Sequence, residues 1–113
     1  MWKPFNPVLG ETFEYQTDNF QFLSEQVSAD PQVVANYCLG KNPEAKYVFW
    51  NNQSTSTKFT GSSLQFGQRF KTYITLEKHQ ETFETESPLI TVNNIIIGKK
   101  YVDVEGSLKV KNL

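Results

Sequence analysis

Apolar and polar residues alternate along most of the chain, and this period of two predicts β-strands. In residues 70–77, Phe70, Ile74 and Leu76 fall on one face and leave polar or amphipathic side chains on the other. Residues 32–39 are rich in Val and Tyr, so we expect a strand there and not a helix. Further strands, separated by turn signals, are expected at residues 11–16, 20–27, 46–59, 63–67, 81–85, 89–97, 101–105 and 107–111. Short strands at this spacing predict an all-β chain that forms an antiparallel sheet, a meander or a partly closed barrel.

A single, strongly curved sheet of this kind has two consequences for function. Its concave face is apolar, and it is a natural place for a hydrophobic ligand. If the sheet does not close, its edges stay open and invite self-association by pairing with another chain. Residues 92–97 have little charge and high β-propensity, so at an open edge they would promote such association.

Length and charge restrict the classes of partner. The chain has 113 residues, which predicts one domain over residues 1–113. Eleven Lys and Arg against twelve Asp and Glu give a formal net charge of −1. We therefore expect no overall attraction to nucleic acid or to an anionic membrane, although a small local basic site is compatible with this balance.

Cysteine usage and hydropathy predict a cytoplasmic protein. Cys38 is the only cysteine, so an internal disulfide cannot form, which suits the reducing cytosol. The N-terminal residues lack the apolar core of a signal peptide. The longest apolar run, Ile95-Ile96-Ile97, is too short to span a bilayer.

The sequence gives little support to an enzyme. A nucleophilic pair of Cys38 and His79, the only histidine, is compatible with the sequence but has no supporting motif. Metal-ligand spacing, a phosphate-cradling glycine loop and a nucleic-acid-binding motif are absent. We expect neither catalysis nor a cofactor.

Four sequence blocks, in order over nearly the whole chain, carry a family resemblance. Residues 3–14 (KPFNPVLGETFE) are similar to the block KPFNPxLGETxE, and residues 25–32 (EQVSADPQ) resemble the signature EQVSHHPP. Residues 59–64 (FTGSSL) resemble FxGKSL, and residues 93–99 (NNIIIGK) resemble hNIIxGK. Together they resemble the oxysterol-binding protein-related family.

The resemblance implies an incomplete antiparallel β-barrel that holds a sterol or another lipid in a hydrophobic tunnel. Many family members exchange that lipid for phosphatidylinositol 4-phosphate between membranes, which is transport without covalent chemistry and implies transient, peripheral membrane contact. The family's usual domain is longer, with a lid before the first block and further basic headgroup contacts after the last. We therefore expect either a fragment or a minimal relative.

Two residues of the first block match headgroup contacts of the family. Lys3 matches a lysine that contacts the inositol phosphate, and an ammonium suits a phosphate as a point charge. Asn6 matches an asparagine near the headgroup. The alternatives are an ordinary solvated lysine and an asparagine that shapes a turn before Pro7.

The signature departs from the family where its two histidines bind phosphate. Ala29 and Asp30 occupy those positions. Alanine cannot donate a hydrogen bond, and a carboxylate about 4 Å from a phosphate charge is repelled by on the order of 4 kcal/mol at an effective dielectric constant near 20. We expect weakened phosphoinositide binding, and Asp30 before Pro31 also fits a turn.

A polar pair follows the apolar run at residues 47–50. In the family, polar groups inside the barrel contact the sterol hydroxyl, often through water, and Asn52 with Gln53 is the candidate here. The alternative is a position at a strand end or in a loop.

Two functions stay open at this point. The first is a lipid-binding or lipid-transfer module for a sterol or similar apolar lipid. The second is a degenerate β-sheet framework or protein-interaction module without lipid function. The missing histidines and the missing lid favour the second, whereas the retained first block with Lys3 and Asn6 favours the first, which is the function we expect.

Overall fold

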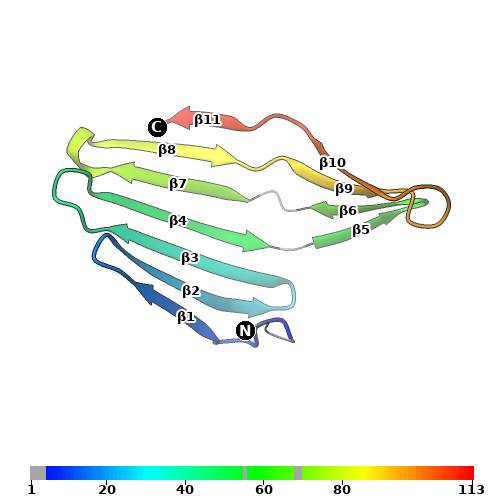
Figure 1. The fold of residues 1–113 in the computed structure, drawn as a ribbon, viewed down its shortest axis with the longest axis horizontal. Helices are drawn as coiled ribbons and strands as arrows, with labels where there is room; N and C mark the ends of the chain where they lie inside the picture. Colours follow the sequence, from blue (N-terminus) through cyan, green and yellow to red (C-terminus); the bar gives the residue numbers. More distant parts are fainter. Residues whose placement is uncertain (1–4, 55, 68–69) are drawn as a thin grey trace.

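The computed structural model describes residues 5–54, 56–67 and 70–113. Within them the chain forms strands and one short 3-10 helix (Figure 1). The elements are β1 (Thr12–Gln16), β2 (Phe20–Ala29), β3 (Gln32–Gly40), β4 (Tyr47–Ser54), β5 (Ser56–Thr60), β6 (Ser63–Gly67), β7 (Lys71–Leu76), η1 (Glu77–His79), β8 (Glu81–Glu86), β9 (Leu89–Asn93), β10 (Tyr101–Glu105) and β11 (Lys109–Asn112). The predicted all-β, antiparallel fold is confirmed, including a strand at residues 32–39.

The strands form two antiparallel sheets that continue one another along the long axis of the molecule (Figure 1). The main sheet has the order β1-β2-β3-β4-β7-β8-β11, and the small sheet has the order β10-β9-β6-β5. Each strand of the small sheet extends the line of a strand in the main sheet (Figure 1). The pairs are β5 with β4, β6 with β7, β9 with β8 and β10 with β11. In the described residues β1 does not pair with β11, so the sheet is open, as expected for an incomplete barrel.

The pairing register gives the main sheet two different faces. Phe22, Cys38 and Phe49 are cross-strand neighbours, and they define what we call the Phe22 face. Tyr37 and Trp50 are opposite each other on the other side, which we call the Trp50 face. A β-bulge between Gln26 and Ser28 interrupts the β2–β3 register.

The open sheet leaves the interior without a closed apolar core. Among the residues that the structure describes, the buried side chains are polar: Gln26, Asn51 and Thr91. Large apolar side chains on both faces are half-buried or exposed. The two faces are therefore surfaces on which another apolar body can lie.

One strand is shorter than its sequence predicts. Residues 89–97 were expected to be continuous, but β9 ends at Asn93. Asn94 has a positive φ of 56°, which leaves the extended conformation. Ile95, Ile96 and Ile97 consequently lie in a loop and do not form part of a sheet edge.

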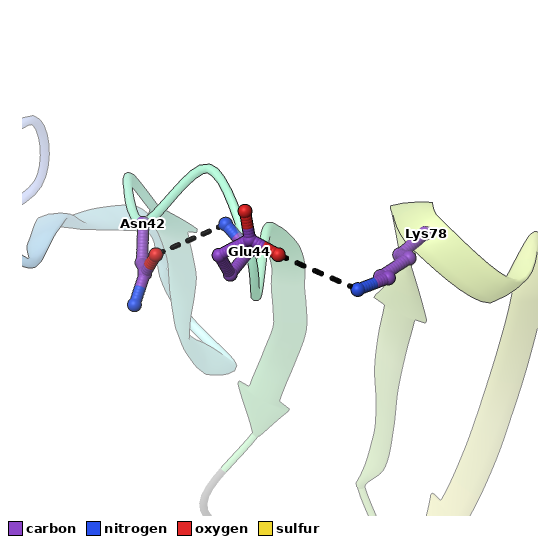
Figure 2. Close-up of polar contacts among 3 residues, drawn as sticks. All are labelled: Asn42, Glu44 and Lys78. Carbon is purple, nitrogen blue, oxygen red and sulfur yellow. Dashed lines mark hydrogen bonds and ion pairs between the residues drawn. The ribbon is translucent and has the colours of Figure 1, made fainter.

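The turns at one end of the main sheet are held by short polar contacts (Figure 2). The Oδ1 atom of Asn42 accepts a hydrogen bond of 3.0 Å from the backbone N–H of Glu44. The Glu44 carboxylate lies 3.5 Å from the Nζ atom of Lys78 in η1. Lys78 and His79 are exposed, as expected for a solvated turn. No helix in the described part of the chain is long and apolar enough to cross a bilayer.

A charged cluster crosses the Trp50 face near the ends of β7 and β8. The rings of Trp50 and Tyr73 stack at 5.3 Å between centroids, and Lys71 lies 3.1 Å from Glu84. Hydrogen bonds from Lys71 and from the Tyr73 hydroxyl lower the pKa of the Glu84 carboxyl. The same ion pair raises the pKa of Lys71.

We predict that Glu84→Gln lowers the melting temperature more at neutral pH than at acidic pH. The folded-state pKa of Glu84 is depressed, so its contribution is present above its ordinary pKa of 4.5 and is lost as the pH falls through the lower folded value. The difference in melting temperature between this variant and wild type should shrink as the pH falls from about 7 to about 3. Glu14→Gln in the exposed strand β1 is the control, and an equal effect of the two substitutions would contradict the assignment.

Candidate functional site

A row of hydrogen-bonded polar side chains crosses four strands of the Phe22 face. The Ser24 hydroxyl donates to Oδ1 of Asn36 at 2.7 Å, and Nδ2 of Asn36 donates to Oδ1 of Asn51 at 2.9 Å. Nδ2 of Asn51 then donates to the Thr72 hydroxyl at 3.2 Å. These residues are opposite one another in the β2–β3, β3–β4 and β4–β7 registers. We call this row the polar ladder.

The ladder is well shielded for a polar structure on an open sheet. Asn51 is only 8% exposed, and its neighbours are half-buried. The ladder keeps unused hydrogen-bonding capacity at both ends, because the Ser24 oxygen can still accept and the Thr72 hydroxyl can still donate. The arrangement therefore offers a donor and an acceptor to one further polar group.

An apolar row lies directly beside the ladder on the same face. It contains the cross-strand neighbours Phe22, Cys38, Phe49, Ile74 and Phe83. Each of them is half-buried. An apolar strip next to a polar row matches a ligand that has a large apolar body and one small polar group.

The segment before β1 is hydrogen-bonded to β2 beside the end of the ladder. The Gly10 N–H donates to the carbonyl oxygen of Gln26 at 2.8 Å, and the Gln26 N–H donates to the carbonyl oxygen of Glu11 at 3.0 Å. These bonds hold the segment on β2. Between them lies a hollow of about 310 Å³, which is lined by Pro7, Glu11, Thr12, Phe13, Ser24, Gln26 and Val34. Ser24 belongs to both the ladder and the hollow, so the two form one site.

The hollow is poor in positive charge. Its lining residues include the Glu11 carboxylate and, among the described residues, no lysine or arginine. Nε2 of Gln26 donates to the carbonyl oxygen of Ser28 at 2.7 Å. A phosphate group would find no cation among these lining residues.

The structure describes three of the four predicted headgroup residues, which are Asn6, Ala29 and Asp30. Asn6 lies in the exposed segment before β1, next to Pro7 of the hollow. Ala29 ends β2 and pairs with Gln32, which the alternation places on the Phe22 face. Asp30 is exposed in the following turn. Lys3 lies outside the described residues.

Asn52 lies on the opposite face from the ladder. It is exposed and pairs with Ala35. It lines a separate hollow of about 440 Å³ together with Leu23, Glu25, Ala35, Asn36, Tyr37, Trp50 and Asn51. The polar residues that meet on the Phe22 face are instead Asn51 and Asn36, which the sequence analysis did not select. Alternation from the apolar Phe49 would have favoured Asn51 over Asn52.

The chain resembles known proteins over its whole length. The family model described as "Oxysterol-binding protein" matches residues 1–113. Human oxysterol-binding protein-related protein 3 is 36% identical over 98% of this chain and 12% of its own length. Human oxysterol-binding protein-related protein 2 is 36% identical over 97% of this chain and 23% of its own length. Oxysterol-binding protein-related protein 2B from Arabidopsis thaliana is 38% identical over 96% of this chain and 15% of its own length. The chain thus spans less than a quarter of the length of these relatives.

Solved structures show the same sheet. The ORD of Osh3 from Saccharomyces cerevisiae in complex with PI(4)P superposes with a TM-score of 0.83 at 28% identity, over 97% of this chain and 29% of that one. The Osh1 ORD in complex with cholesterol gives a TM-score of 0.81 at 33% identity, over 97% of this chain and 27% of the Osh1 chain. An Osh1 structure with ergosterol matches equally well.

Proposed function

The chain belongs to the oxysterol-binding protein family, and from this premise we propose that it is the β-sheet part of a lipid-binding module whose cargo is a sterol or a similar apolar lipid. The observation that carries this proposal is the polar ladder beside the apolar row on the Phe22 face. The resemblance to an ORD that binds cholesterol and ergosterol supports it.

The two rows suit the two parts of a sterol. Contact of the rings with the row around Phe49 removes apolar area from water on both partners, at about 25 cal/mol per Å². A hydroxyl that leaves water needs a hydrogen-bonding partner, which Ser24 or Thr72 can supply. Release into a membrane requires no covalent chemistry, so no catalytic residue or cofactor is needed.

Phosphoinositide binding is proposed to be weaker than in relatives such as Osh3, whose ORD binds PI(4)P. Ala29 lies on the Phe22 face and cannot donate a hydrogen bond from its side chain. Asp30 in the adjoining turn carries a carboxylate where the family signature has a histidine. A dianionic phosphate near this carboxylate would be repelled.

Other properties of the module are also proposals. Contact with membranes is transient and peripheral, because the cargo must be exchanged with a bilayer, and the location is cytoplasmic. The outer strands of the described sheets are open, and self-association through them is an expectation from the architecture.

Native mass spectrometry of the purified chain, with extraction of co-purified lipid, is the first test. We expect a stoichiometric sterol or similar lipid and uptake of sterol from a cyclodextrin complex. A chain that is empty, and that ignores sterol and phosphoinositide vesicles alike, would instead be a framework without lipid function. The same spectrum reports dimers.

Adjacent asparagines on opposite faces provide a matched pair of variants. We predict that Asn51→Leu lowers sterol affinity by about tenfold, because it removes the centre of the ladder and leaves groups of Asn36 and Thr72 unpaired, at about 1–3 kcal/mol. Asn52→Leu on the Trp50 face should leave the affinity unchanged.

Titration of a fluorescent sterol measures both affinities, and circular dichroism confirms that both variants are folded. A loss confined to Asn52→Leu would place the sterol on the Trp50 face and would contradict the proposed site. Thr72→Val, which removes the ladder's terminal hydroxyl, should reduce affinity less than Asn51→Leu.

A further inference from the structure

The loop between β9 and β10 is tied into a defined shape. Asn94 and Gly98 have positive φ angles of 56° and 97°, and Nδ2 of Asn94 donates to the carbonyl oxygen of Lys99 at 3.2 Å. The Ile95 N–H donates to the carbonyl oxygen of Ser62 at 3.0 Å, which joins this loop to the β5–β6 turn. A second bond between the same segments runs from the Ser63 hydroxyl to Oδ1 of Asn93, at 2.8 Å. We call residues 58–63 and 94–100 together the sheet tip.

Large apolar side chains project from the sheet tip into solvent. Ile96 is 67% exposed and Ile97 is 82% exposed, and Phe59 in β5 is 59% exposed. Isoleucine is among the residues most often buried in proteins, and Ile97 is among the most exposed of the large apolar side chains that the structure describes. A tied loop that presents them is suited to contact with an apolar phase.

Lysines lie close in sequence to these apolar side chains. Lys99 and Lys100 follow Ile97 after Gly98, and Lys58 precedes Phe59. Neither segment of the sheet tip contains an aspartate or glutamate. The whole chain has a net charge of −1, so this cationic character is local and does not reflect overall composition.

The sheet tip and the β2–β3 turn open toward the same side of the molecule (Figure 1). In Figure 1 the tip is at the far right of the long axis, and the β2–β3 turn with Asp30 opens toward the same side. The β3–β4 loop and η1 lie at the opposite side. A bilayer that approaches the right-hand side in this view therefore meets the sheet tip first.

We infer that the sheet tip is a docking site for the surface of an anionic lipid bilayer. Ile96 and Ile97 enter the headgroup region, and Lys99, Lys100 and Lys58 contact lipid phosphates. The choice of a bilayer over a protein partner rests on the proposed function, since a lipid carrier must turn its cargo site toward a membrane. The mixture of apolar apex and flanking lysines matches the membrane interface, where buried apolar area and attraction to anionic lipids add.

Flotation with vesicles of phosphatidylcholine, with and without phosphatidylserine, tests the docking site. We expect the chain to bind the vesicles that contain phosphatidylserine, and Ile97→Glu to reduce that binding by at least about tenfold. Leu113→Glu is the matched control, because Leu113 is also strongly exposed but lies at the other side of the molecule (Figure 1). It introduces the same charge and should leave binding nearly unchanged.

A second arm isolates the charge. Lys99→Gln with Lys100→Gln should weaken binding only to the phosphatidylserine vesicles and should flatten its dependence on salt. Equal binding by wild type and Ile97→Glu, or equal losses in Ile97→Glu and Leu113→Glu, would overturn the inference. The inference would also be overturned if the wild-type chain bound no vesicles but bound a protein partner through the sheet tip.

Uptake of sterol from cyclodextrin separates this inference from the proposed function. The variants of the sheet tip should load sterol like wild type, because the Phe22 face is unchanged. A chain that binds vesicles through the tip but takes up no sterol would refute the cargo and keep the docking site. A chain that takes up sterol but does not bind vesicles through the tip would refute only the docking site.

Discussion

Replacing Ala29 and Asp30 with histidine should raise the affinity for vesicles that contain phosphatidylinositol 4-phosphate by at least about tenfold. The double substitution removes one carboxylate and adds two groups that can donate hydrogen bonds to phosphate. The repulsion by Asp30, on the order of 4 kcal/mol at about 4 Å before screening, is large enough that its removal alone should be measurable.

Three comparisons separate the contributions to this gain. Asp30→Asn removes the charge without supplying an imidazole, so it should give only part of the effect. Asp18→His, in the turn between β1 and β2, adds a histidine away from the site and should give none. The gain should also be larger at about pH 6 than at about pH 8, because a free histidine has a pKa of about 6.5 and only the protonated ring is positively charged.

The outcome also reports on the rest of the headgroup site. Backbone hydrogen bonds between Gly10, Glu11 and Gln26 hold the family's first sequence block on β2, which leads into the β2–β3 turn. A variant that folds but shows no gain in affinity would mean that these neighbours no longer form a phosphate site.

Gly40→Val should lower the free energy of unfolding by about 2–3 kcal/mol, the upper part of the range for an overpacked site. Gly40 is the last residue of β3, it is buried, and a Cβ atom built on it would overlap the ring of Tyr47. Gly40→Val would therefore push the Tyr47 ring aside. Burial raises the pKa of the Tyr47 hydroxyl, and its oxygen lies 4.0 Å from Sγ of Cys38.

A double-mutant cycle identifies the clash as the cause. In a Tyr47→Ala background the space above Gly40 is empty, so Gly40→Val should cost much less, with a coupling of about 1 kcal/mol or more. Urea denaturation measures all four proteins. Additive effects would show that the cost at position 40 comes from backbone conformation and not from Tyr47.

The arrangement of strands was largely predictable from alternation, because one side chain in two must leave water on a half-covered sheet. The residue at which β9 ends was not predictable from alternation. The isoleucines after Asn94 have the β-propensity of a strand, but a single residue with positive φ redirects the chain before them.

The polar ladder shows where sequence reasoning stops. Asn51 and Asn52 are chemically the same, and only their phase relative to the sheet distinguishes them. Which polar residues share a face across the sheet depends on the pairing of β2, β3 and β4. Within β2, the bulge between Gln26 and Ser28 changes which residues point to each face. Family resemblance identified the fold, which is confirmed. Alternation from Phe49 separates Asn51 from Asn52, but only the pairing register brings Asn51 beside Asn36 and Thr72.

The absence of buried apolar side chains in the described sheet bears on how its stability depends on temperature. Unfolding changes the heat capacity mainly in proportion to the apolar surface that it exposes to water. A sheet whose apolar residues are already half in water gains little new exposure, so its stability curve is shallow. A lipid lying on the Phe22 face would supply the missing burial and steepen that curve. In thermodynamic terms, the cargo would then be part of the hydrophobic core, and a loaded and an empty chain would be two proteins with different heat capacities of unfolding.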